Sequence, residues 1–68
     1  MERLTLRAAR TNAGYTQENA ANLLNVNTCT LSNWERGVSM PKANQITAIC
    51  DLYGVTFDTL IFLPNKLA

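Results

Sequence analysis

Turn signals divide this chain into short segments, and this division constrains its fold more than any other feature. Groups of residues typical of turns, containing Gly, Asn or Pro, fall at 12–14, 24–25, 37–41, 54 and 64. Between them apolar residues recur every three or four positions, and no segment alternates apolar and polar residues with the period of a strand. The pattern predicts five short helices and argues against a β-sheet.

The first two expected helices are bounded by residues that favour helix ends. One covers about residues 4–13 and stops at Gly14, which readily adopts a left-handed backbone. The other covers about 17–24, where the Thr16 hydroxyl can cap the first free N–H groups. Asn25 follows directly and tolerates positive φ better than other non-glycine residues, so the chain can turn sharply there.

The remaining expected helices have similar end signals. The third covers about residues 28–36, between a cap at Asn27 and a stop at Gly37. The fourth carries an apolar stripe that ends at Gly54, and Thr56 is placed to cap a short fifth helix. The residues expected to face the core from these three helices are Leu31, Trp34, Ile46, Ile49, Cys50, Tyr53, Phe57 and Ile61.

Length and cysteine content fit one small domain in a reducing compartment. The 68 residues suit a single domain spanning 1–68, with its core in 4–62. Cys29 and Cys50 are too few for a disulfide-stapled scaffold, and both fall inside expected helices, so we expect reduced thiols. The N-terminal stretch is charged and lacks the apolar run of a signal peptide or membrane span. The expected location is the cytoplasm, without a membrane partner.

Composition argues against an enzyme. The chain has no His, which removes the usual general base, the Ser-His and Cys-His dyads and the common zinc patterns. We therefore expect no catalytic residue, metal, cofactor or small-molecule ligand. The formal net charge of +1 does not by itself point to nucleic acid, but eight Asn and eight Thr, many of them between 11 and 33, supply uncharged hydrogen-bonding groups.

Two expected helices joined by a tight turn, 17–24 and 28–36, form a helix-turn-helix, whose second helix can enter a DNA major groove. The motif residues in and around it are Leu6, Arg7, Arg10, Thr16, Gln17, Ala21, Val26, Leu31, Ser32, Trp34, Glu35, Gly37, Pro41, Gly54, Val55, Asp58 and Leu60. In these residues the chain resembles the Xre family, which includes the Cro and repressor proteins of lambdoid phages. The resemblance covers 6–61 and implies an all-α, five-helix, lambda-repressor-like DNA-binding domain.

The resemblance also implies DNA contacts at particular residues. Gln17 opens the second helix, where its amide can hold a phosphate, unless it merely occupies the first helical position. Asn33 lies on the helix face opposite Leu31 and can bind adenine N6 and N7, unless it is simply solvated. Thr30 is left open, because it could equally serve a local capping role. The other candidate DNA-binding residues are Asn27, Thr28, Cys29, Ser32, Arg36, Lys42 and Asn44.

Together these features predict a sequence-specific transcriptional regulator that binds double-stranded DNA, a repressor on the strength of the family resemblance. Because one domain of net charge +1 would bind DNA weakly, we expect a homodimer on a two-fold operator. Its candidate contact residues are Phe62, Leu63 and Leu67. The alternative is a protein-binding module on the same fold, such as an antitoxin or an antirepressor partner. A largely buried ion pair between Arg10 and Glu35 is also expected, because each charge falls near the core.

Overall fold

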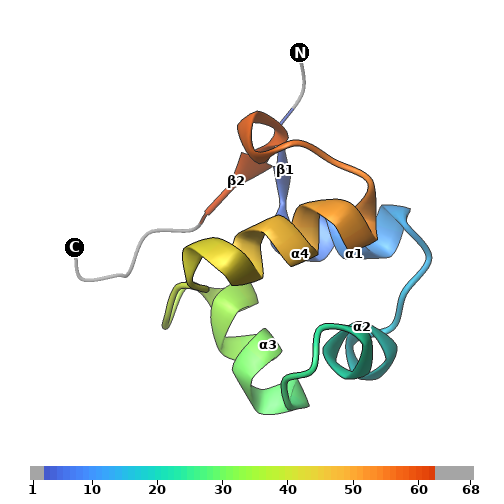
Figure 1. Cartoon of the computed structure of the whole chain (residues 1–68), viewed down its shortest axis with the longest axis vertical. Coiled ribbons are helices and arrows are strands. Elements are labelled where there is room, and N and C mark those ends of the chain that lie inside the picture. Colours follow the sequence, from blue (N-terminus) through green and yellow to red (C-terminus); the bar gives the residue numbers. More distant parts are fainter. Residues whose placement is uncertain (1–2, 63–68) are drawn as a thin grey trace.

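Four short α-helices pack around one core in the computed structural model, which describes residues 3–62 (Figure 1). The elements in chain order are β1 (Leu4–Thr5), α1 (Leu6–Asn12), α2 (Gln17–Leu23), α3 (Thr28–Arg36), α4 (Ala43–Tyr53), the 3₁₀ helix η1 (Phe57–Thr59) and β2 (Leu60–Ile61). The first four predicted helices are confirmed, and the short 3₁₀ helix η1 stands where a fifth was predicted. None of the helices in residues 3–62 combines the length and the apolar composition that a membrane span needs.

The predicted caps define the starts of α2 and α3. Thr16 Oγ1 accepts a hydrogen bond from the backbone N–H of Asn19 (3.1 Å), and Asn27 Oδ1 accepts one from that of Thr30 (2.8 Å). In the turn between the two helices Asn25 adopts a φ of 62°, as predicted for a residue that tolerates a left-handed backbone. Local contacts therefore decide where α3 begins.

The prediction that the chain contains no sheet is wrong. β1 and β2 pair in parallel, with Leu4 opposite Leu60, and α1 therefore begins at Leu6 rather than near residue 4. Strands of two residues are too short for an alternating pattern to be visible in the sequence. Thr5 ends the strand and also caps α1, because its Oγ1 accepts a hydrogen bond from the backbone N–H of Ala8 (3.1 Å).

The C-terminal end also departs from the prediction. Thr56 does not cap an α-helix: its hydroxyl lies 2.9 Å from the hydroxyl of Thr59, and the backbone becomes extended at Leu60. Because helical spacing ends there, Phe57 and Ile61 do not join the core as predicted and are 58% and 37% exposed. Leu60 is buried instead, beside β1.

The core lies between the four α-helices and the small sheet. Its buried apolar residues are Leu6, Ala9, Ala20, Ala21, Leu31, Trp34, Ile49, Tyr53 and Leu60. Because Ala20 and Ala21 are small, α2 can pack closely against α3 at these positions. Ile46 and Cys50 of α4, which the stripe predicted as core residues, are only half-buried.

Candidate nucleic-acid interface

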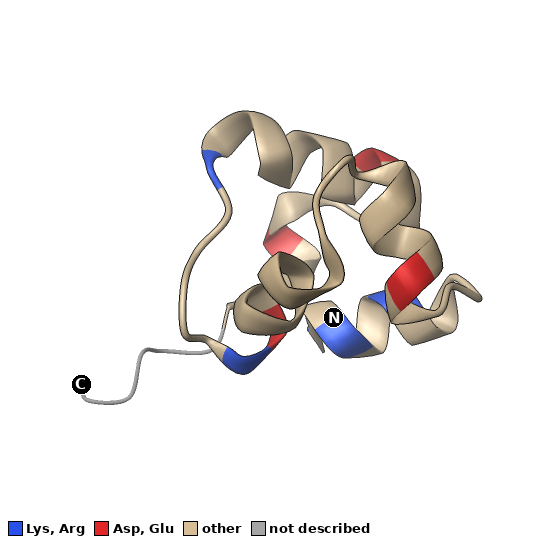
Figure 2. Cartoon of the chain, turned by 90° about the horizontal axis from the view of Figure 1, so that it is seen from below, with Lys and Arg blue, Asp and Glu red and all other residues tan. Residues whose placement is uncertain are grey.

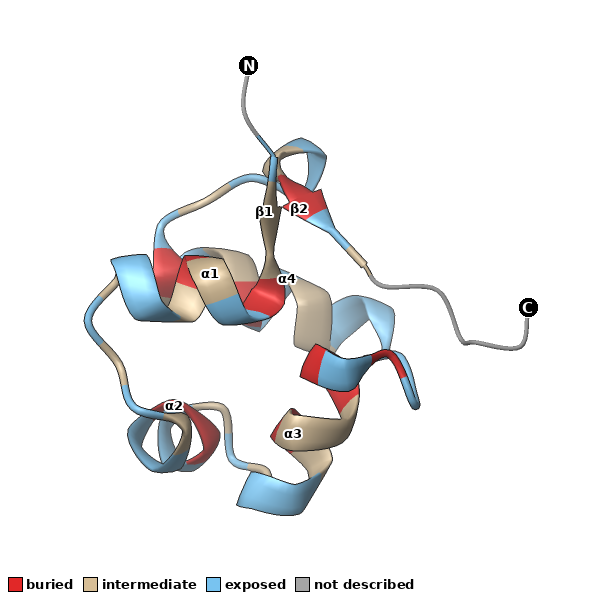
Figure 3. Ribbon diagram, turned by 180° about the vertical axis from the view of Figure 1, so that it is seen from behind, coloured by how far each residue is buried: buried red, intermediate tan, exposed pale blue. Residues whose placement is uncertain are grey.

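Helix α3 has one buried and one accessible face. Leu31, Trp34 and Glu35 are 0%, 5% and 9% exposed. The helix lies at the end of the molecule away from β1 and β2 (Figure 3). On the other face, Thr28, Cys29 and Arg36 are exposed and Thr30, Ser32 and Asn33 are half-buried. The accessible face of α3 is therefore mostly uncharged and rich in hydrogen-bonding groups.

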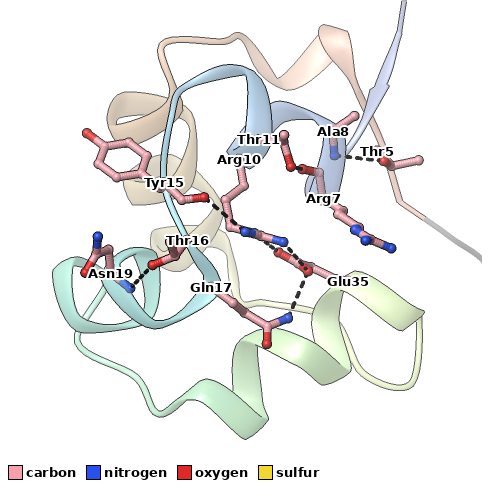
Figure 4. A network of polar contacts seen from close by, with 10 residues as sticks. All are labelled: Thr5, Arg7, Ala8, Arg10, Thr11, Tyr15, Thr16, Gln17, Asn19 and Glu35. Atoms are coloured by element: carbon pink, nitrogen blue, oxygen red, sulfur yellow. Dashed lines mark hydrogen bonds and ion pairs between the residues drawn. The ribbon is translucent and has the colours of Figure 1, made fainter.

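An ion pair holds the inner side of α3 to α1 (Figure 4). Arg10 Nε donates a hydrogen bond to Glu35 Oε2 (2.7 Å), and Arg10 Nη2 donates a longer one to Oε1 (3.4 Å). The two side chains are only 12% and 5% exposed, so the predicted buried pair is confirmed. Arg10 Nη1 also donates to the backbone oxygen of Tyr15 (3.0 Å). The guanidinium thus connects α1, the loop before α2 and α3.

Gln17 joins the same network, which sequence reasoning missed. Its Nε2 donates to Glu35 Oε1 (3.1 Å), so the amide predicted to hold a phosphate is itself held by a carboxylate. A Gln amide nitrogen carries two hydrogens, and one N–H remains for another acceptor. The contact spans 18 residues of sequence and has no local pattern that could have revealed it. A phosphate contact by Gln17 stays a prediction, now with its amide orientation set by Glu35.

Tyr53 of α4 lies close to this network. Its ring centroid is 6.2 Å from that of Tyr15. Burial raises the pKa of the Tyr53 hydroxyl to about 12, and the negative charge of Glu35 contributes to the increase. The hydroxyl oxygen is buried and has no hydrogen-bond partner among the described residues. An unpaired buried hydroxyl is costly to stability.

Asn33 and Arg36 are brought together on α3. Arg36 Nη2 donates to Asn33 Oδ1 (2.9 Å) one turn earlier in the helix. Reading adenine requires that Oδ1 accept from the base N6 while the Asn nitrogen donates to N7. The Asn33 oxygen has two lone pairs, so it can accept from the base while it keeps the bond from Arg36. The predicted base contact at Asn33 is compatible with its half-buried position and stays a prediction.

Two of the candidates at the start of α3 line a hollow of about 400 Å³. Asn27 and Thr28 line it together with Asn22, Asn25 and Val26. Asn27 Oδ1 already accepts the capping hydrogen bond, so the amide nitrogen of this side chain is the group that can donate to another partner. Cys29 is exposed and its thiol is free.

Lys42 and Asn44 lie at the start of α4, and both are exposed. Asn44 lines a hollow with Leu24 and Trp34, which places it beside the helix-turn-helix. Lys42 lacks the hydroxyl that would cap α4, and Gln45 Oε1 instead accepts from the Lys42 backbone N–H (2.7 Å). Figure 2 shows the start of α4 at a distance from the basic residues of α1 and α3. Lys42 is therefore apart from the basic residues of α1 and α3.

A further hollow, of about 380 Å³, opens between α1, α2 and α3 and is called here the α1–α3 hollow. Three of its lining residues, Gln17, Ser32 and Arg36, are predicted site residues that the fold brings together. The others are Arg7, Arg10 and Glu35. Sequence reasoning missed Arg7 as a site residue, although its place one helical turn before Arg10 was a usable signal.

The fold and this interface define a class of protein. Residues 3–61 match the family described as "Helix-turn-helix domain", and the chain belongs to that family. The match confirms the Xre-type helix-turn-helix indicated by the sequence.

Over 56 residues the chain is 41% identical to a protein named HTH-type transcriptional regulator ImmR, from Bacillus subtilis (strain 168). The aligned part covers 82% of this chain and 44% of that regulator. The chain thus spans less than half the length of this relative.

Proposed function

We propose that this chain is a sequence-specific DNA-binding transcriptional regulator that places α3 in the major groove. The observation that carries the proposal is the division of α3, whose inner face is fixed by Leu31, Trp34 and Glu35 while its polar face is accessible. A helix presented in this way can reach base edges without disturbing the core. The name of the relative, which describes a transcriptional regulator of the helix-turn-helix type, supports this function.

The candidate residues divide between the two kinds of DNA contact. Thr28, Cys29, Ser32 and Asn33 lie on the accessible face of α3 and are assigned to base edges. The residues assigned to the phosphate backbone, which would position the domain without reading sequence, are Gln17, Asn27, Arg36, Lys42 and Asn44.

We further propose that the chain acts as a repressor and binds a two-fold operator as a homodimer. A net charge of +1 gives a single domain little non-specific attraction to DNA, whereas two linked half-sites multiply the affinity. Phe62 is half-buried, and its ring centroid lies 5.8 Å from that of Phe57, which is 58% exposed. These two rings form an apolar surface suited to a second copy. Leu63 and Leu67, the other expected contacts, lie outside the described residues.

Selection of bound sequences from a random DNA pool, followed by titration at several salt concentrations, tests this function. We expect recovery of a two-fold sequence and an affinity that falls as salt rises. Asn33→Ala is expected to weaken binding to the selected sequence, while Asn12→Ala, at an exposed position on α1, serves as the matched control. Recovery of no common sequence, or binding that salt does not weaken, would contradict the proposal.

A second candidate function is a protein-binding module on the same fold. An apolar hollow lined by Ala43, Ile46, Cys50 and Phe57 favours it, because an exposed apolar hollow suits a protein partner. A module that bound only protein would show no salt-dependent binding to DNA of any sequence, so the same titration separates the two functions.

A further inference from the structure

Positive charge is concentrated in the α1–α3 hollow, although the chain as a whole has a low net charge. Arg7, Arg10 and Arg36 line it with Glu35 as the single acid, which gives a formal charge of +2 at one place in a chain whose formal net charge is +1. Figure 2 shows the basic residues of α1 and of the end of α3 along one edge of the molecule. The remaining lining residues, Gln17 and Ser32, are uncharged hydrogen-bonding groups.

The one carboxylate in the hollow is already satisfied by its neighbours. Glu35 Oε2 accepts from Arg10 Nε, and Oε1 accepts from Arg10 Nη2 and Gln17 Nε2. Its charge is therefore compensated by Arg10. Among residues 3–62 the only ion pair is that between Arg10 and Glu35, which leaves Arg7 and Arg36 without a carboxylate partner.

The two remaining cations approach the hollow from different helices. Arg7 lies on α1, one turn before Arg10, and Arg36 lies next to Glu35 at the end of α3. Arg36 uses one N–H group to bind Asn33 Oδ1, and a guanidinium has five such donors. Arg36 can therefore keep this contact and still donate to an anion. The two guanidinium groups and the Ser32 hydroxyl can each donate to a phosphate oxygen in the hollow.

We propose that Arg7 and Arg36 together hold one phosphate of the DNA backbone in the α1–α3 hollow, an inference that rests on the proposed function. The hollow borders the face of α3 that carries Ser32 and Asn33. A phosphate held there flanks the base pairs that α3 reads, and it fixes the depth and register of the helix in the groove. Arg7, outside the helix-turn-helix itself, thereby becomes a positioning residue for sequence recognition.

The first test is the salt dependence of binding to the selected duplex. Each phosphate neutralised contributes about 0.9 to the slope of log affinity against log salt, and two arginines on one phosphate share that contribution. Arg7→Gln and Arg36→Gln should therefore each reduce the slope, by no more than about 0.9, and the double variant should reduce it by about 0.9 rather than by twice that amount. For affinities that agree at 1 M salt, the full reduction is a loss of about eightfold at 0.1 M salt. Arg3→Gln, which removes an exposed arginine outside the hollow, is the matched control and should change the slope much less.

The second test asks whether both arginines hold the same phosphate. In duplexes carrying one uncharged methylphosphonate per half-site, the unsubstituted protein should lose affinity at each phosphate that it contacts, and at one and the same of these positions Arg7→Gln and Arg36→Gln should both lose less than the unsubstituted protein. If either variant still loses the full amount at every position, the two arginines do not share a phosphate and the inference is wrong. A slope unchanged by Arg7→Gln overturns this inference alone, whereas an unsubstituted protein without salt-dependent DNA binding overturns the proposed function with it.

Discussion

The carboxylate of Glu35 binds the guanidinium of Arg10 across 25 residues of sequence, with Nε and Oε2 2.7 Å apart. Because both side chains are largely buried, neither charge can return to water while the domain stays folded. The pair therefore fixes the distance between α1 and α3, and with it the face that α3 presents.

Removal of either partner of this pair should be strongly destabilising. Glu35→Ala leaves the Arg10 charge buried without compensation, and we expect a loss of about 3–5 kcal/mol in the free energy of unfolding. Urea denaturation measures it. The double variant Arg10→Met with Glu35→Leu removes both charges and should recover much of the loss. An unchanged midpoint for Glu35→Ala would show that the ion pair contributes nothing.

Gln17→Ala should weaken DNA binding without changing its sequence preference. If the second N–H of the Gln17 amide holds a phosphate, every duplex loses the same contact, since all sequences offer the same backbone oxygens. The same substitution also removes the bond to Glu35 and should cost about 1 kcal/mol of stability. Titration against the selected duplex and a random one, well below the melting temperature, checks the first effect. A loss confined to the selected duplex would assign Gln17 to base recognition instead.

Asn33→Ala should instead relax sequence preference. If Asn33 reads a base edge, the variant loses about 1–3 kcal/mol on the selected duplex and much less on random DNA. The measurement uses duplexes with single-base changes at each half-site position, at one salt concentration. Equal losses on all sequences would make Asn33 a backbone contact, and no loss would transfer base readout to Thr28, Cys29 and Ser32.

Asn27 offers a substitution that separates its cap from its proposed DNA contact. Asp is as good an N-cap as Asn, so Asn27→Asp should keep the stability of the domain. Its negative charge beside α3 should nevertheless weaken binding to all DNA. Asn27→Ala, which loses the cap, should cost about 1 kcal/mol of stability. Thermal melts and DNA titrations of both variants give the comparison, and undiminished DNA binding by Asn27→Asp would place this residue away from the backbone.

Tyr53 should make the domain less stable at high pH. Its folded pKa of about 12 lies above the ordinary value of 10.0, so the folded state keeps a proton that the unfolded state releases. The contribution of Tyr53 to the free energy of unfolding is constant below pH 10. It falls between pH 10 and 12, by up to about 1.4 kcal/mol per unit of pKa difference. Tyr53→Phe should remove this decrease. At neutral pH it should leave stability equal or higher, because the buried hydroxyl lacks a partner among the described residues. A lower melting temperature for Tyr53→Phe at pH 7 would contradict this account.

The parts of the fold that could be predicted are those decided by nearby residues. The caps Thr16 and Asn27 bind backbone groups three residues away, and Asn25 turns the chain through its own φ. The sheet was missed because Leu4 and Leu60 come together from opposite ends of the chain. For the same reason the bond from Gln17 to Glu35 left no trace in any local pattern.

The same distinction between local and long-range contacts applies to the candidate site. Helical periodicity could place Thr28, Cys29 and Arg36 on an accessible face, because such a face depends only on the helix and its buried side. It could not show that Arg7 and Arg36 line the same hollow. That relation depends on side-chain conformation and on the packing of α1 against α3.

The pairing of β1 with β2 ties the two ends of the described chain together at the end of the molecule opposite α3 (Figure 1). A fluorophore or a fused domain attached directly beside β1 would therefore start on the side remote from the exposed face of α3. The pairing also connects the first and last elements of the described chain directly to each other. Force applied between β1 and β2 must therefore break the short sheet and expose Leu60 before it acts on any helix. Mechanical unfolding of the domain should accordingly start at its smallest element.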